Sequence, residues 1–308
     1  MTVLEPSPVH GAAAVHDLPM ERVNAPQGFW RGFGGTVTDI WRYRELLTNL
    51  VRKELKVKYK GSFLGFAWSL ARPILMLVIY YIAIGKFLKS PVPDFVVFLF
   101  SGLVAWTFFA DVVTGATSAI TGNAGLIKKV YFPREILPLS VVGAALVQLA
   151  LMLLVLFTVV LLSGRHVGLV HLLYLPYAMV PLLLFSVAIA LLMSAANVYL
   201  RDTQHLVEVG LLFWFYMTPV LYAYGTVQDK IVKVGPWLEQ LYLANPLAIV
   251  AFGFQDAIYQ TGQVDGVQLL YDGPLALRLG ILTAVSAAFL WFSQRVFARA
   301  QGNFAQEL

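Results

Sequence analysis

The chain has no cysteine and few charged residues. Of its 308 residues only 13% are Asp, Glu, Lys or Arg, whereas soluble domains carry about 25%. The absence of cysteine excludes disulfides, thiolate metal ligands and cysteine nucleophiles. The low charge, 59% hydrophobic residues and a mean hydropathy of +0.73 exclude an ordinary soluble domain. The sequence therefore predicts a protein that crosses a membrane several times.

Motifs for nucleotide and metal chemistry are also missing. The phosphate loop GxxxxGK[ST] does not occur, so the chain is not expected to bind ATP in that way. Neither HExxH nor GxSxG is found, and the five histidines are scattered. We therefore expect no metal, no other cofactor and no catalytic residue in this chain. An integral membrane enzyme built from distant side chains remains an alternative.

Six apolar stretches are long enough to cross a bilayer, which takes about 20 residues in a helix. The segment 225–275 is mixed, and within it residues 236–260 are expected to form short re-entrant or interfacial helices. The expected fold is thus an all-α integral membrane protein with six spans. These predicted spans are residues 66–87, 95–116, 137–162, 173–198, 206–224 and 276–297.

Lysine and arginine are distributed unevenly between the two predicted sides. If both termini are cytoplasmic, most of the 22 cations lie on the inner side, as the positive-inside rule requires. The net charge of +5 is then a signal of topology and does not indicate nucleic-acid binding. The predicted organisation is a flexible cytoplasmic tail at 1–36, an interface helix at 37–61, a six-span domain at 62–300 and a cytoplasmic tail at 301–308.

Residues 40–60 have the pattern of an amphipathic helix that lies in the inner membrane interface. Gly61 is expected to end it. Two roles stay open: a simple cationic anchor, or a platform for anionic headgroups or a phosphate-bearing substrate. The predicted apolar face consists of Ile40, Tyr43, Leu46, Leu47, Leu50, Val51, Leu55 and Val57. The candidates for such a phosphate contact are Arg52, Lys53, Lys56, Lys58 and Arg72.

Two loops predicted on the inner side carry charged turns. The first is GNAGLIKKVYFPREILPLS at 122–140, and the second is NVYLRDTQHLVEVG at 197–210. A short charged helix between spans suits contact with a soluble partner, although helix capping and positive-inside charge explain the same residues. The candidates for such a contact are Lys128, Lys129, Tyr131, Phe132, Pro133, Arg134, Glu135, Arg201 and Asp202.

Aromatic residues make up 14% of the chain. Interfacial belts and packing explain many of them, but several fall within the predicted spans. Because aromatic faces stack on sugar rings, a glycan passage lined by these residues is a reasonable hypothesis. The candidates for the lining are Tyr80, Tyr81, Trp106, Phe109, Phe213, Trp214 and Tyr216.

Several segments together resemble the membrane subunit of ABC-type polysaccharide exporters, the class that serves O-antigen, teichoic acid and related glycans. The resemblance runs from about residue 40 onward. LIKKVYFPREILPLS is its most specific part, whereas a bare RD or NP is not specific. Where related chains often place an arginine after ANPL, this chain has Phe254-Gln255. The other matching segments are LLTNLVRKELKVKYKGSFLGFAWSLARP, VYLRD, MTPVLY and ANPL.

The resemblance implies a homodimer in the bacterial inner membrane that pairs with two copies of a separate ATPase, which would bind ATP and Mg²⁺. The loop at 122–135 and the amphipathic helix would contact that ATPase. The substrate would be a polysaccharide on a polyprenyl diphosphate, moved outward from the cytoplasmic side. The alternatives are an ABC permease for a drug or lipid and an ATP-independent flippase for lipid-linked glycans.

Overall fold

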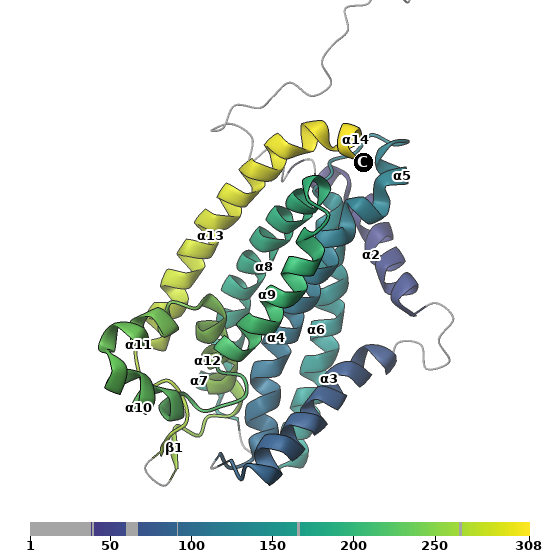
Figure 1. Ribbon diagram of the computed structural model, residues 1–308. Helices are drawn as coiled ribbons and strands as arrows, with labels where there is room; N and C mark the ends of the chain where they lie inside the picture. The colour runs from purple at the N-terminus through teal and green to yellow at the C-terminus, as the bar shows by residue number, and fades with distance from the viewer. Residues whose placement is uncertain (1–37, 39, 60–66, 91, 165–166, 265–266) are drawn as a thin grey trace, which may run out of the picture.

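A computed structural model describes residue 38 and residues 40–59, 67–90, 92–164, 167–264 and 267–308. The predicted tail at 1–36 and the predicted helix end at Gly61 lie outside this part. The described chain is almost entirely helical (Figure 1). The exception to the all-α prediction is one small hairpin, in which β1 (Gln263–Val264) pairs antiparallel with β2 (Val267–Gln268).

The helices run through the described chain in the following order and with the following bounds. They are α2 (Arg44–Tyr59), α3 (Ala67–Tyr80), the π-helical turn η1 (Tyr81–Phe87), α4 (Phe95–Ala119), the 3₁₀ turn η2 (Thr121–Asn123), α5 (Ala124–Ile127), α6 (Ile136–Leu162), α7 (Leu169–Leu172), α8 (Tyr174–Tyr199), α9 (Thr203–Met217), α10 (Tyr224–Val234), α11 (Pro236–Leu243), α12 (Pro246–Ile258), α13 (Leu275–Ala300), the 3₁₀ turn η3 (Gln301–Asn303) and α14 (Phe304–Glu307).

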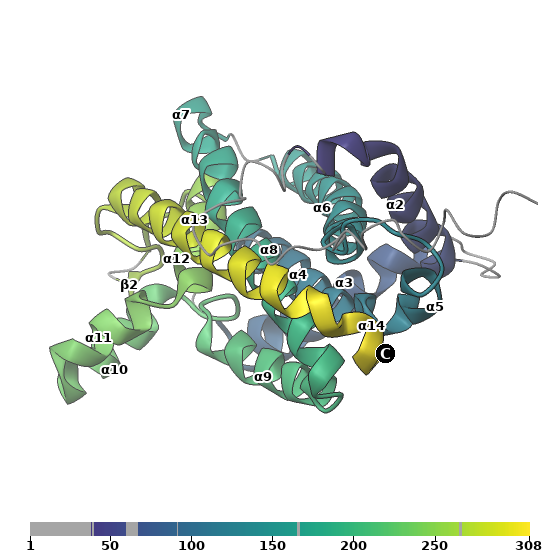
Figure 2. The same cartoon turned by 90° about the horizontal axis from the view of Figure 1, so that it is seen from above.

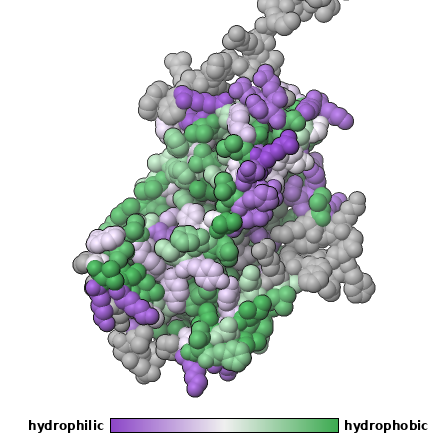
Figure 3. Space-filling view, in the orientation of Figure 1, coloured by the Kyte–Doolittle hydropathy of each residue, from purple (hydrophilic) through white to green (hydrophobic). Residues whose placement is uncertain are grey.

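The helices form an elongated bundle with two distinct ends (Figure 1). The α5 end, uppermost in Figure 1, gathers α5, the start of α9 and α14. The α10 end, at the bottom, gathers α7, α10, α11 and the hairpin. Hydrophilic residues lie mainly around the α5 end and over α10 and α11, with a largely apolar middle between them (Figure 3). This distribution is the one expected of a protein whose middle is embedded in lipid.

Four of the six predicted spans are confirmed as helices long and apolar enough to cross a membrane. They are Phe95–Ala119, Ile136–Leu162, Leu169–Tyr199 and Leu275–Asn303. The predicted re-entrant segment is also helical: Trp237–Leu243 and Pro246–Ile258 meet at 73°. That bend is typical of a re-entrant loop or a broken span, which agrees with the sequence expectation.

The first and fifth predicted spans are not confirmed as full crossings. The first region is helical from Ala67 to Phe87 as α3 and η1, close to the predicted bounds, but its apolar helix is the shorter Pro73–Phe87. In the fifth, α9 has 15 residues and ends at Met217, not near residue 224. At 1.5 Å per residue, α9 is about 22 Å long, less than the ~30 Å hydrocarbon core. The total of six crossings therefore stays a prediction.

Helix α4 is the centre of the bundle. Its most apolar stretch is 78% buried, compared with 22% for α13. Figure 2 shows α4 among α3, α6, α8 and α12, with α13 crossing on the outside. Because most of its surface is covered by other helices, α4 is the scaffold on which they pack; only a stripe from Trp106 through Ala110 to Thr114 is less buried.

Small residues set how closely several helices approach. A β-carbon built on Gly115 of α4 would lie 2.7 Å from Val141 Cγ1 of α6, and one on Gly253 of α12 would lie 2.6 Å from Ala178 Cβ of α8. Both distances are too short for real carbon atoms. Glycine is needed at these points because small residues let membrane helices pack closely.

Candidate functional site

Helix α2 packs against the first half of α6 with the face that the sequence predicted. Leu50 is buried in a cluster at the α5 end, and Leu46 and Leu47 pack on it. The contact with α6 is close, because a β-carbon on Gly143 would lie 2.6 Å from Val51 Cγ2. Near the end of α2 this face is no longer covered by protein: Leu55 is half-buried and Val57 is 63% exposed. An apolar side chain that is exposed there is available to the membrane interface, so its place on the apolar face stays a prediction.

The cations of α2 have different surroundings. Arg52 and Lys56 are exposed, so both charged groups are accessible. Lys53 is also exposed, but its ammonium donates a hydrogen bond to the side-chain carbonyl of Asn123 in η2. The interface helix is thus tied to the turn that precedes α5. The side chains of the remaining candidates, Lys58 and Arg72, lie outside the described ones.

The first half of the loop after α5 projects from the α5 end. Lys128 and Lys129 are exposed, and Tyr131 is 61% exposed. Arg201 and Asp202, in the turn between α8 and α9, are exposed as well. The structure therefore presents two charged turns at the same end of the bundle, as the sequence predicted. A soluble partner could reach both.

The second half of the same loop is packed instead of exposed. Phe132 is 4% exposed and belongs to the buried cluster at the α5 end. Glu135 is also 4% exposed. The guanidinium of Arg134 donates a hydrogen bond to the main-chain carbonyl of Gln301, and Pro133 is half-buried. The sequence analysis grouped residues 128–135 as candidates for one contact with a soluble partner. The structure divides them into an exposed part and a part that packs against the rest of the protein.

The predicted lining aromatics belong to a band of rings across the middle of the bundle. Trp106 lies 5.2 Å from Phe215 between ring centroids, and Phe109 lies 5.2 Å from Trp214. Tyr80 joins the band through Phe215 at 5.8 Å. Such tilted and edge-to-face pairs stabilise packing beyond the area that they bury. In this arrangement these rings hold α3, α4 and α9 together.

The other lining candidates differ in exposure. Phe109 is fully buried, so in this arrangement it packs and lines no surface. Phe213 and Tyr216, on the outer face of α9, are 69% and 54% exposed. Tyr81 is half-buried, with the Lys86 ammonium 5.5 Å from its ring centroid. The exposed rings of α9 are therefore the best placed to face lipid, a second copy or a passing substrate.

Asn245 connects α9 to the re-entrant helices, a role that was not assigned from the sequence. Its Oδ1 accepts from the main-chain N–H of Leu247 at 3.1 Å and from the indole of Trp214 at 2.9 Å. Its Nδ2 donates to the Met217 carbonyl and to Thr218 Oγ1, both at 3.3 Å. The segments MTPVLY and ANPL thus meet in space, and their occurrence together was the signal that could have identified this junction.

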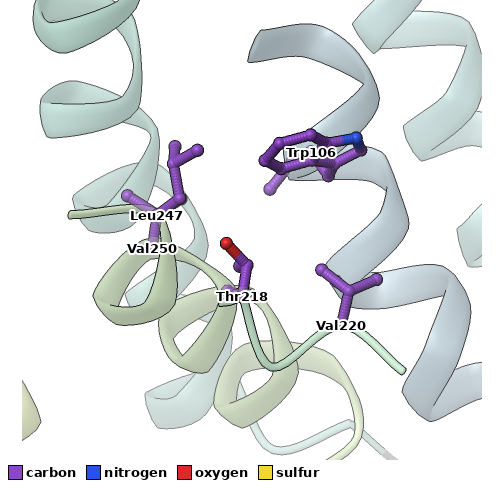
Figure 4. Close-up of a pocket in the computed structure, with 8 residues that line it drawn as sticks. Trp106, Thr218, Val220, Leu247 and Val250 are labelled. Atoms are coloured by element: carbon purple, nitrogen blue, oxygen red, sulfur yellow. The ribbon is translucent and has the colours of Figure 1, made fainter. Parts of the chain in front are cut away.

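Gln255, which follows ANPL where the resemblance led us to look for an arginine, is part of the packing between α12 and the segment after α9. It is 1% exposed, and its amide donates to the Pro219 carbonyl at 2.8 Å. A small pocket with no room for a water molecule lies nearby, where α4, α12 and residues 218–220 meet. Figure 4 shows Trp106 and Val220 on one side of it and Leu247 and Val250 on the other. The apolar lining makes this pocket a packing gap at the joint.

A polar cluster holds α10 and α11 together at the α10 end. The Tyr224 hydroxyl donates to Glu239 Oε1 at 2.6 Å, and the Gln228 amide donates to the same oxygen at 3.0 Å. Burial, and then the hydrogen bond to the carboxylate, raise the pKa of Tyr224 well above its usual value. The phenol therefore stays protonated and remains a donor. Among the described residues, no group of His, Asp and Glu is placed to hold a metal ion.

The described chain thus combines an all-helical membrane bundle, an amphipathic helix beside it and two charged turns at one end. Residues 45–259 match the ABC-2 type transporter membrane family. The chain belongs to this family and is a transporter permease.

Three relatives show which kind of transporter permease this chain is similar to. The chain is 33% identical over 273 residues to the O-antigen export system permease protein RfbA of Myxococcus xanthus, covering 88% of this chain and 98% of that protein. It is 30% identical over 229 residues to a protein of the same name from Klebsiella pneumoniae, covering 74% and 85%. A second Klebsiella pneumoniae protein of that name is 31% identical over 212 residues, covering 69% and 79%.

Proposed function

We propose that this chain is the permease subunit of an ATP-driven exporter that moves a polysaccharide, linked to polyprenyl diphosphate, out of the cytoplasm. The observation that carries the proposal is the alignment with RfbA of Myxococcus xanthus, which extends over 98% of that protein. The family match over residues 45–259 includes nearly all of the interface helix, the charged turns and the re-entrant pair.

The substrate would enter along α2. A diphosphate is a dense anion and needs charge-assisted hydrogen bonds, which arginine and lysine supply. Arg52 and Lys56 are the best placed candidates because both are exposed. Lys53 supports the site differently, since its bond to Asn123 ties α2 to the turn before α5. The platform role of the interface helix is therefore favoured over a simple anchor.

The transport energy would come from a separate ATPase that binds ATP and Mg²⁺, two copies of which would assemble with two copies of this chain. Its docking surface would consist of Lys128, Lys129, Tyr131, Arg201 and Asp202. The exposure of all five at one end of the bundle supports this assignment. In the bacterial inner membrane this end would be cytoplasmic, with both termini on that side.

The polysaccharide would pass along a surface that includes Phe213 and Tyr216 of α9. Both rings are exposed in a single copy, so a second copy facing them would enclose a passage lined with aromatic faces. Sugar rings stack on such faces without strict sequence specificity. This placement suits a substrate that is a long and repetitive chain.

Depletion of the protein in its host tests the function. Polyprenyl-linked glycans would be extracted from depleted cells, and the polymer at the cell surface would be quantified in the same culture. We expect a lipid-linked polymer to accumulate inside the cell while the surface polymer falls, and its sugar composition would identify the cargo. Unchanged lipid-linked glycans with an intact surface polymer would refute a glycan substrate and favour a drug or lipid cargo.

A further inference from the structure

Residues 301–308 are folded against the α5 end, although the sequence suggested a tail. They form η3 (Gln301–Asn303) and α14 (Phe304–Glu307). In Figure 1, α14 lies at the α5 end of the bundle and near α5 itself. Neither the family nor the substrate explains why these residues should be ordered there.

The first contact of this segment is with the loop that follows α5. The Gln301 carbonyl accepts a hydrogen bond from the Arg134 guanidinium. The Gln301 side-chain amide donates to Glu135 Oε1 at 3.4 Å. One residue of the segment is therefore bonded to two consecutive residues of the loop, and Glu135 among them is almost fully buried. This part of the loop cannot move without moving the segment.

The second contact is with the end of α8, just before the Arg201-Asp202 turn. Phe304 is fully buried. Its ring lies 5.5 Å from that of Phe297 and 6.2 Å from that of Tyr199. The Tyr199 hydroxyl donates to the Ala300 carbonyl at 2.9 Å. The segment is thus wedged between the two loops that carry the exposed charges.

We infer that residues 301–308 are a brace that makes the two charged loops move as one body with α13. Phe304 and Gln301 are positioning residues: they touch neither ATP nor glycan, but they fix the geometry of the surface that the ATPase would push. The inference rests on the proposed function, in which that surface docks the ATPase. Close-packed groups shift as units and do not deform continuously, so a push on either loop reaches the spans through the brace.

The test uses the full complex of this chain and its ATPase, reconstituted in lipid vesicles. The variants are Phe304→Ala, Phe304→Leu and, as a matched control, Asn303→Ala, whose side chain is exposed in the adjacent position. The measured quantity is the amount of glycan moved per ATP hydrolysed. We expect about a fivefold or larger fall for Phe304→Ala, within the usual range of coupling between sites. Phe304→Leu should recover most of the loss, and the control should match the parent chain.

A distance measurement keeps the inference testable if Phe304→Ala is poorly active for other reasons. Because the chain has no cysteine, a chain that carries both Lys129→Cys and Arg201→Cys takes spin labels at these two positions and nowhere else. The distance distribution between these labels should be narrow in the parent and clearly broader with Phe304→Ala, but not with Asn303→Ala. An unchanged distribution and an unchanged glycan-to-ATP ratio would overturn the brace.

A further variant, in the proposed docking surface, distinguishes failure of the brace from failure of that surface. Tyr131→Ala changes an exposed residue of the proposed contact and leaves the brace intact. If Tyr131→Ala lowers coupling and Phe304→Ala does not, the brace is refuted and the docking surface stands. If Phe304→Ala lowers coupling and Tyr131→Ala does not, the brace is supported and the placement of the docking surface is wrong at that residue.

Discussion

Replacement of Asn245 by alanine tests the junction between α9 and the re-entrant pair. Asn245 caps α12 through the N–H of Leu247 and also binds the indole of Trp214. Its amide donates to the end of α9 at Met217 and Thr218. Alanine removes all four hydrogen bonds without adding bulk, so the loss of stability measures what the junction contributes.

The expected magnitude follows from two terms. Replacing an asparagine cap by alanine costs about 1 kcal/mol. The half-buried indole of Trp214 then lacks its acceptor, and an unsatisfied donor costs about 1–2 kcal/mol. We therefore expect Asn245→Ala to lower the free energy of unfolding by about 2–3 kcal/mol.

The assay is denaturant unfolding in detergent micelles, followed by far-ultraviolet circular dichroism. Asn303→Ala is the matched control, because Asn303 precedes α14 but caps it with no side-chain hydrogen bond. This control should change stability by less than about 0.5 kcal/mol. In a Trp214→Phe background the cost of Asn245→Ala should shrink by about 1 kcal/mol. Equal costs for the two alanine variants would refute the junction.

Three further predictions concern packing and coupling. Gly143→Ala should destabilise the protein by about 1–3 kcal/mol through overpacking against α2, and Val51→Ala in the same chain should restore most of that loss in the unfolding assay. Phe109→Ala should cost about 3–5 kcal/mol as a core truncation, whereas Phe213→Ala should leave stability unchanged and lower the rate of glycan transport in vesicles. Arg134→Ala should lower coupled transport while the ATPase of the complex keeps measurable basal hydrolysis.

Each of these predictions has an outcome that would contradict it. Gly125→Ala is the control for Gly143→Ala, since a β-carbon there meets nothing within 4 Å, and equal effects would remove the steric argument. A stability loss for Phe213→Ala comparable to that of Phe109→Ala would place Phe213 in the core. Transport at the parental rate with Arg134→Ala would rule out a coupling role for this arginine.

The sequence predicted the long helices well because their signal is local. A run such as residues 136–162 is long and strongly apolar. In a bilayer such a segment forms a helix, because its main-chain N–H and C=O groups must be hydrogen-bonded within the segment. The face of α2 that carries Leu46, Leu47 and Leu50 was also predicted, because helical periodicity is a local property. Val57, on the same predicted face, is exposed because it lies beyond the part of α2 that the bundle covers. Helical periodicity identifies which side of a helix is apolar. It does not tell how far along the helix that side is covered by the rest of the protein.

The sequence could not predict contacts made between distant parts of the chain. The end of α9 at Met217 depends on hydrogen bonds from Asn245, far along the sequence. The division of the loop after α5 depends on Gln301 and Phe304, which belong to a segment that the pattern indicated as a tail. The sequence therefore identified the two charged loops, while the division of their residues into exposed and packed ones depends on contacts between distant parts of the chain.

The most direct test of the central claim is transport by the purified components. This chain and its ATPase would be reconstituted in sealed vesicles that carry a labelled polyprenyl-diphosphate glycan on the ATPase side. The account predicts that the label reaches the opposite side only with ATP and Mg²⁺, and that transport falls when Arg52 and Lys56 are both changed to glutamine. Transport that is equally fast without ATP, or no transport by a complex that hydrolyses ATP normally, would contradict it.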